Sequence, residues 1–139
     1  MSNLWMISLL LVLAALAFQS HPAYAQPNVC KVIETYSKRK CAEFETYGCA
    51  CGANKTGIPI DGVDTCCSEK KLCFERNGCN IREDIKVNCT KHCVCNSGKN
   101  PHTCAFKACR CNIEMGRCLA RYKFNKAYAR YNYKKCRFE

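Results

Sequence analysis

Polar and hydrophobic residues recur with the period of an α-helix over about residues 62–76. Pro59 precedes this stretch, and Asp61 or Asp64 supplies a cap or a first-turn anion, so a helix is predicted to begin here. Five residues recur at helical spacing and share one face of this helix, namely Val63, Cys66, Lys70, Cys73 and Phe74. A lysine on such a face is unexpected, because lysine is rarely buried without a partner.

A second long helix is predicted over about residues 103–122, where cysteines recur every seven residues and form a stripe along one face. If the two helices lie antiparallel, one docking places Cys66 beside Cys118 and Cys73 beside Cys111. Both pairs fit that docking because Cys66 and Cys73 are seven residues apart on one helix, as are Cys111 and Cys118 on the other. The spacing therefore permits an antiparallel helix pair joined by two disulfides.

Three shorter elements complete the predicted organisation. Residues 29–38 are expected to form an N-terminal helix, residues 47–62 are rich in Gly and Pro and predict a loop, and residues 81–94 suggest a small β-hairpin. The inward side chains of the N-terminal helix are expected to be Val32, Ile33 and Tyr36. With no repeats or Gly/Ser linkers, the sequence indicates one mainly α, disulfide-rich domain.

The apolar run over residues 4–18 has the length of the hydrophobic part of a signal peptide and is too short for a confident membrane span. Ala23 and Ala25 fit a small-residue cleavage site. We therefore predict a signal peptide over residues 1–25, a folded domain over residues 26–139, and a secreted, extracellular protein without a transmembrane segment.

All sixteen cysteines lie after the predicted signal peptide. In an oxidising compartment, this density and even number indicate eight disulfides, which supplement the small core of a short chain. The cluster from Cys89 to Cys95 has spacing that also suits zinc, but the predicted export favours disulfides over metal ligands.

The predicted domain keeps all 22 basic and all 11 acidic residues, so its formal charge is +11. Such a charge attracts anionic surfaces over long distances. Nucleic acid is a poor candidate for an exported, disulfide-linked domain. Anionic phospholipid, fatty acid or an acidic protein is expected as the partner.

Several motifs together resemble the secreted phospholipase A2 family. They are YGCACG from residue 47, PIDGVDTCC from residue 59, KLCF from residue 71, CAFKACRCN from residue 104, and the tail FNKAYARYNYKKC. The resemblance implies the phospholipase A2 fold, built on two long antiparallel helices linked by disulfides, and calcium-dependent hydrolysis of the phospholipid sn-2 ester in active members.

The resemblance also implies the disulfide pairing. Six bridges follow from the pancreatic and elapid-type pattern, namely Cys49–Cys136, Cys51–Cys67, Cys66–Cys118, Cys73–Cys111, Cys79–Cys104 and Cys95–Cys109. A seventh bridge, Cys30–Cys89, follows if Cys30 is the cysteine of the N-terminal helix, and Cys41 is the alternative to Cys30 in that role. Cys41–Cys93 is then left as the eighth pair.

The catalytic positions of the family are replaced in this chain. Active members carry a general-base histidine and a calcium-binding aspartate where this sequence has Lys70 and Lys71, and an orienting aspartate where it has Asn112. Phe74 stands where the family has a tyrosine. The resemblance therefore implies that hydrolysis is lost, since both the base and the metal ligand are missing.

The calcium loop is altered as well, because the residues after Gly52 include Asn54 and a further lysine, Lys55. Calcium requires six to eight oxygen ligands that include a carboxylate, so we expect no calcium and no other cofactor. Asn54 and Asn88 also begin N-glycosylation sequons.

The expected function is a non-enzymatic lipid-, membrane- or protein-binding module. The Lys70 stem is expected to fill the former catalytic pocket. Its ammonium is expected to bind Asn112 or a carbonyl, or to take the place of calcium. For Lys71, the alternative is a solvated charge on the surface. Lys70 is also a candidate for binding a fatty-acid carboxylate or a lipid phosphate.

The C-terminal third holds eight Lys and Arg residues interleaved with Tyr and Phe, which suits a membrane surface. Its candidates for lipid contact are Lys123, Phe124, Lys126, Tyr128, Arg130, Tyr131, Lys134 and Lys135. The alternative for this third is a solvated basic surface with some Tyr in the core. The alternatives are an active calcium-dependent phospholipase A2 and a structural or receptor-binding secreted protein.

Overall fold

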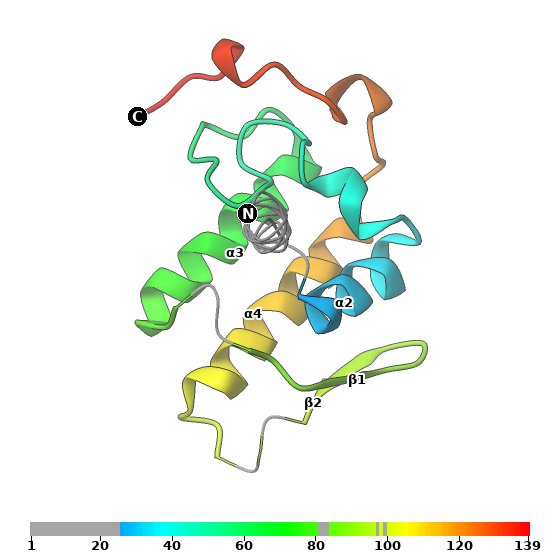
Figure 1. The fold of residues 1–139 in the computed structure, drawn as a ribbon, viewed down its shortest axis with the longest axis vertical. Coiled ribbons are helices and arrows are strands. Elements are labelled where there is room, and N and C mark those ends of the chain that lie inside the picture. Colours follow the sequence, from blue (N-terminus) through cyan, green and yellow to red (C-terminus); the bar gives the residue numbers. More distant parts are fainter. Residues whose placement is uncertain (1–25, 81–83, 97, 99) are drawn as a thin grey trace, which may run out of the picture.

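The computed structural model describes residues 26–80, 84–96, 98 and 100–139. The predicted signal peptide lies outside the described residues. Within them the chain folds into three α-helices, one two-stranded sheet and three short 3-10 helices (Figure 1). No helix of this part of the chain is long and apolar enough to cross a membrane.

The two long helices are α3 (Gly62–Asn77) and α4 (Cys104–Leu119). Helix α3 begins at Asp61, whose carboxylate accepts a hydrogen bond from the Asp64 N–H at 2.8 Å. It ends at Gly78, which adopts the left-handed conformation that glycine tolerates best. Helix α4 begins after Thr103, whose hydroxyl accepts a hydrogen bond from the Phe106 N–H. Both predicted helices are thus confirmed, and the second is shorter at its C-terminal end.

The predicted antiparallel docking of these helices is confirmed by two interhelical disulfides. Cys66 pairs with Cys118 and Cys73 pairs with Cys111, with Cα–Cα distances of 5.6 and 5.7 Å. Figure 1 shows α3 in green, with α4 beside it in yellow to orange. The two bridges are seven residues apart on each helix, so they hold the helix pair as a rigid frame around the residues between them.

The N-terminal helix α2 (Pro27–Ser37) packs against α4. Val32 and Ile33 are buried as predicted, whereas Tyr36 is only half-buried and its hydroxyl accepts a hydrogen bond from the Cys93 N–H. Gly116 permits the close approach, since a Cβ at this position would lie 2.5 Å from the Tyr36 ring.

The small hairpin is confirmed over a shorter range than predicted. Its strands are β1 (Val87–Cys89) and β2 (Cys93–Cys95), which pair antiparallel with Asn88 opposite Val94. A third predicted feature, the loop that follows Tyr47, is also present and is held against the start of α3 by the Cys51–Cys67 disulfide.

All sixteen cysteines are paired, and six of the eight predicted bridges are confirmed. The predictions Cys30–Cys89 and Cys41–Cys93 are wrong, because the bonds are Cys30–Cys41 and Cys89–Cys93. The chain turns back after α2 and brings Cys41 within 5.1 Å (Cα–Cα) of Cys30. The hairpin register places Cys89 directly opposite Cys93.

The residues after α4 form a C-terminal segment, which we define as residues 122–138. It crosses the loop that follows Tyr47, at the end of the molecule opposite the β-hairpin (Figure 1). The Cys49–Cys136 disulfide fixes it there, together with a hydrogen bond from the Ile58 N–H to the Arg137 carbonyl at 2.8 Å. The loop and the C-terminal segment therefore form one surface.

Candidate functional site

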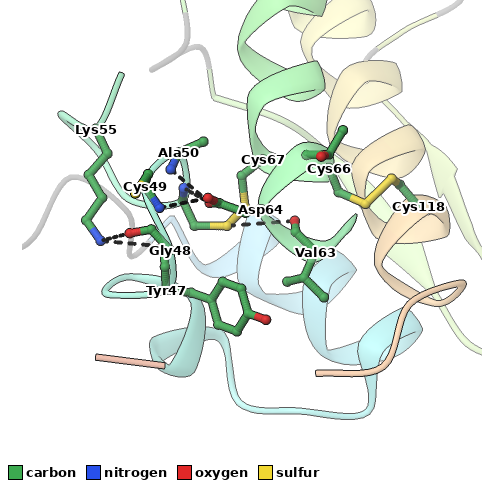
Figure 2. The surroundings of a disulfide bond; sticks show 12 residues. Tyr47, Gly48, Cys49, Ala50, Lys55, Val63, Asp64, Cys66, Cys67 and Cys118 are labelled. Carbon is green, nitrogen blue, oxygen red and sulfur yellow. Dashed lines mark hydrogen bonds between the residues drawn. A yellow bond between two sulfur atoms is a disulfide. The ribbon is translucent and has the colours of Figure 1, made fainter. Parts of the chain in front are cut away.

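The loop over residues 47–57, which we call the 47–57 loop, is organised around the carboxylate of Asp64. This side chain is fully buried in the first turn of α3. The backbone N–H groups of Cys49, Ala50 and Cys51 donate to it at 2.7, 2.8 and 3.0 Å (Figure 2). The N–H of Ile60 donates to it at 3.1 Å. Four amide donors stabilise the charge of a carboxylate in the absence of water. The sequence indicated Asp64 only as a helix-capping anion.

Gly48 allows this approach. Its φ is +53°, a conformation that favours glycine, and a Cβ at this position would lie 2.3 Å from the Asp64 carboxyl carbon. The carboxylate and the 47–57 loop therefore fit together only with glycine at this position.

The carbonyl groups of the 47–57 loop accept hydrogen bonds from two lysines. The Lys71 ammonium, which extends from α3, donates to the carbonyl of Ala50 at 2.5 Å and to that of Lys55. The Lys55 ammonium donates to the carbonyls of Gly48 at 3.0 Å and Tyr47 at 3.4 Å (Figure 2). Lys71 is half-buried and bound to the loop, so the alternative prediction of a solvated surface charge is wrong for this residue.

The electrostatics of this site follow from one buried anion and two nearby cations. Burial lowers the pKa of Lys71, the Asp64 carboxylate opposes that shift, and Lys55 adds to it. Burial also lowers the pKa of Lys55, again opposed by Asp64. The carboxylate thus favours the charged forms of both lysines, which is the form that donates to the carbonyls.

Lys70 lies inside the protein between the two interhelical bridges. Its residue is 5% exposed, and it lines a groove of about 570 Å³ between α3 and α4. Burial lowers the pKa of Lys70 to about 8, with a smaller contribution from Lys71. Lys70 is thus buried, and the filling of the former catalytic pocket by its stem stays a prediction.

Asn112 and Phe74 complete the positions that the family resemblance assigns to catalysis. Both are buried. The Asn112 amide donates to the Ala108 carbonyl at 2.9 Å, and its side-chain oxygen has no hydrogen-bond partner in the part of the chain that the structure describes. Of the alternatives predicted for the Lys70 ammonium, a hydrogen bond to this oxygen is therefore not formed. The carbonyls of Ala50 and Lys55 accept from Lys71.

The basic residues of the C-terminal segment are exposed, whereas several of its aromatic rings are half-buried. Its exposed candidates for lipid contact are Lys123, Lys126, Arg130, Lys134 and Lys135, and Tyr131 is half-buried. Phe124 and Tyr128 are half-buried and pack against the core, and their contact with lipid stays a prediction.

Phe124 belongs to an aromatic cluster. Its ring lies 4.8 Å (between ring centroids) from that of Tyr47, and the Arg39 guanidinium lies 3.9 Å above it. Two rings that the predicted set left out, Tyr122 and Phe138, are more exposed, at 48% and 54%. Helical periodicity gives no signal for them, because this segment has little regular structure.

Both predicted glycosylation sites lie at the surface. Asn54 is exposed at a turn of the 47–57 loop, and Asn88 is exposed on β1.

Comparison with known proteins identifies the family. Residues 27–129 match the model of the phospholipase A2 family. The chain is 31% identical over 115 residues to phospholipase A2 A2-hormotoxin-Apt1a of Adamsia palliata, which covers 75% of this chain and 70% of that protein.

Two snake proteins extend the comparison. A basic phospholipase A2 of Micrurus corallinus is 29% identical over 141 residues, covering 92% of this chain and 97% of that protein. The acidic phospholipase A2 homolog textilotoxin D chain of Pseudonaja textilis is 32% identical over 91 residues, covering 59% and 60%. The chain belongs to the phospholipase A2 family.

We predict that Lys70 makes stability depend on pH. Its folded-state pKa of about 8 lies below its ordinary value of 10.5. Between these two pH values the unfolded chain binds more protons, so stability rises with pH through this window. Lys70→Met is expected to be more stable than the wild type at pH 7, with a difference that shrinks by about 2 kcal/mol by pH 9.5 in urea unfolding. The exposed control Lys91→Met should show no such change, and a pH-independent gain for Lys70→Met would contradict the assignment.

The second prediction concerns Asp64. In Asp64→Asn, an amide NH₂ replaces one carboxylate oxygen and faces backbone donors instead of accepting from them. We expect a loss of about 3 kcal/mol in the free energy of unfolding, measured by urea denaturation. Asp84→Asn, at an exposed carboxylate, should change it by less than about 0.5 kcal/mol. Equal effects of the two substitutions would disprove the central role of Asp64.

Proposed function

We propose that this protein is a secreted phospholipase A2-like protein that binds anionic phospholipid surfaces and does not hydrolyse them. The observation that carries the proposal is the Lys71 ammonium bound to the carbonyls of Ala50 and Lys55. This lysine stands where the family resemblance places the calcium-binding aspartate.

The donor set around the loop does not fit calcium. Calcium takes six to eight oxygen ligands with carboxylates among them, whereas here two ammonium groups already donate to the carbonyls of the 47–57 loop. The one nearby buried carboxylate, Asp64, accepts from four backbone amides. A divalent cation would be repelled by the ammonium groups of Lys55 and Lys71. No step of a reaction is therefore assigned to calcium in this chain.

The position of the general base supports the same proposal. Lys70 has a pKa of about 8, so most of its amine is protonated and cannot accept a proton at pH 7. Asn112 has no negative charge with which to orient a base. Even the neutral fraction of Lys70 would act without an electrophile for the ester carbonyl, which active members obtain from a metal ion.

Membrane binding is supported by the composition of the C-terminal segment. Its exposed lysines and arginines occur beside the exposed rings of Tyr122 and Phe138. Aromatic rings at headgroup level and cations near anionic lipid are the usual features of a surface that docks on a membrane. The formal charge of +11 favours the approach to such a surface.

The absence of catalysis is tested with mixed micelles of phosphatidylcholine. We expect no release of fatty acid above the buffer rate with millimolar calcium, while an active member of the family in the same assay confirms the conditions. The variant Lys70→His/Lys71→Asp is expected to stay inactive, because Asn112 and Lys55 remain. Calcium-dependent release by the wild-type protein would overturn the proposal in favour of an active enzyme.

Binding is tested by cosedimentation with vesicles of phosphatidylglycerol and phosphatidylcholine. We expect Lys134→Ala/Lys135→Ala to weaken binding about 30-fold, since each cation near an anionic membrane contributes about 1 kcal/mol. The control Lys91→Ala removes an exposed charge on the hairpin and should leave affinity nearly unchanged. Equal binding to pure phosphatidylcholine vesicles, or no binding to either, would favour an acidic protein or a receptor as the partner.

A further inference from the structure

Asn54 lies beside the surface to which membrane binding is assigned. Two residues later, the Thr56 N–H donates to the hydroxyl of Tyr133 at 3.0 Å. The intervening Lys55 places its ammonium 5.7 Å from the centroid of the Tyr133 ring. Tyr133 is followed by the exposed cations Lys134 and Lys135. A group attached to Asn54 would therefore stand next to the basic residues of the C-terminal segment.

Asn88 also begins an N-glycosylation sequon, but it lies far from the C-terminal segment. It is exposed on β1, and the hairpin lies at the end of the molecule opposite the C-terminal segment (Figure 1). A group attached there would leave the C-terminal segment uncovered. The chain thus offers two sequons, of which only the one at Asn54 adjoins the proposed membrane surface.

We propose that Asn54 is a site of N-glycosylation and that its glycan weakens docking of the C-terminal segment on anionic membranes, so that glycan occupancy at Asn54 regulates membrane affinity. This inference rests on the proposed membrane binding and on the predicted export of the chain. Asn88 is the second glycan acceptor, and a glycan there is compatible with docking.

The modification is a transfer from a lipid-pyrophosphate-linked oligosaccharide. The Asn54 side-chain nitrogen forms a bond to the anomeric carbon of the first sugar, while the bond between that carbon and the pyrophosphate oxygen breaks. The amide loses one proton, and the lipid pyrophosphate leaves with the bonding electrons. No oxidant or reductant is needed. Asn54 suits this chemistry because it is exposed at a turn and the Asn-Lys-Thr sequence is present.

The glycan acts as a hydrophilic spacer. The attraction between a lysine and anionic lipid falls off within a Debye length, about 8 Å at physiological ionic strength. A branched oligosaccharide beside Lys134 is bulky and remains hydrated, so it holds the cations farther than this from the headgroups. The same glycan leaves the fold intact because Asn54 is exposed.

The experiment expresses the full chain in a eukaryotic secretory host as the wild type and as Asn54→Gln, Asn88→Gln and the double variant. Glycopeptide mass spectrometry measures occupancy at each asparagine, and cosedimentation with phosphatidylglycerol/phosphatidylcholine vesicles measures binding. We expect Asn88→Gln, with its glycan at Asn54 alone, to bind at least tenfold more weakly than Asn54→Gln. Thr56→Ala removes the sequon while keeping Asn54 and should match Asn54→Gln.

The outcomes separate this inference from the proposed function. The role of the glycan is overturned if Asn54 is unmodified. It is also overturned if Asn54→Gln and Asn88→Gln bind vesicles equally while the double variant binds them. Both outcomes leave membrane binding intact. A double variant that does not bind vesicles overturns the membrane proposal itself, and the blocking role of the glycan falls with it. Recovery of binding when an endoglycosidase trims the Asn54 glycan to one sugar supports the spacer role.

Discussion

The arrangement of the 47–57 loop depends on the buried carboxylate of Asp64. It draws together the backbone N–H groups of three consecutive loop residues and that of Ile60, so the loop is closed around an anion supplied by α3. Gly48 allows the approach, and the Cys51–Cys67 bridge holds the same two elements covalently. With the amides directed at the carboxylate, the carbonyls of the loop are left to accept from cations.

Those cations belong to the chain itself. Lys71 and Lys55 donate to the loop carbonyls, and Asp64 favours their charged forms. The loop carbonyls are thus bound by ammonium groups that are covalently part of the chain. Lys70 contributes unfavourably to the free energy of folding, because it is buried next to Lys71 and its pKa is lowered. A buried cation of this kind opposes folding, and the eight disulfides offset such costs by restricting the unfolded chain.

The C-terminal segment combines a structural and a proposed binding role. Its inward rings join the aromatic cluster around Tyr47, and the Cys49–Cys136 bridge fastens it to the loop. Its outward cations are therefore presented on a surface that is continuous with the 47–57 loop. A change on the loop, whether of charge or by attachment of a glycan at Asn54, acts on the surface that the C-terminal segment presents.

Local sequence was sufficient for the helices, because helical period is a property of the chain itself, and the cysteine spacing permitted the interhelical bridges that the family resemblance implied. Local sequence was insufficient for the pairing of Cys30 and Cys89, since each bonds whichever cysteine a turn or a strand register brings near. The same holds for the partners of Lys71 and for Phe124, whose ring faces the core because Tyr47 and Arg39 meet it there. The order of residues settles which chemical groups are present. Which of these groups meet depends on the fold, because contacts between distant segments carry no local periodicity.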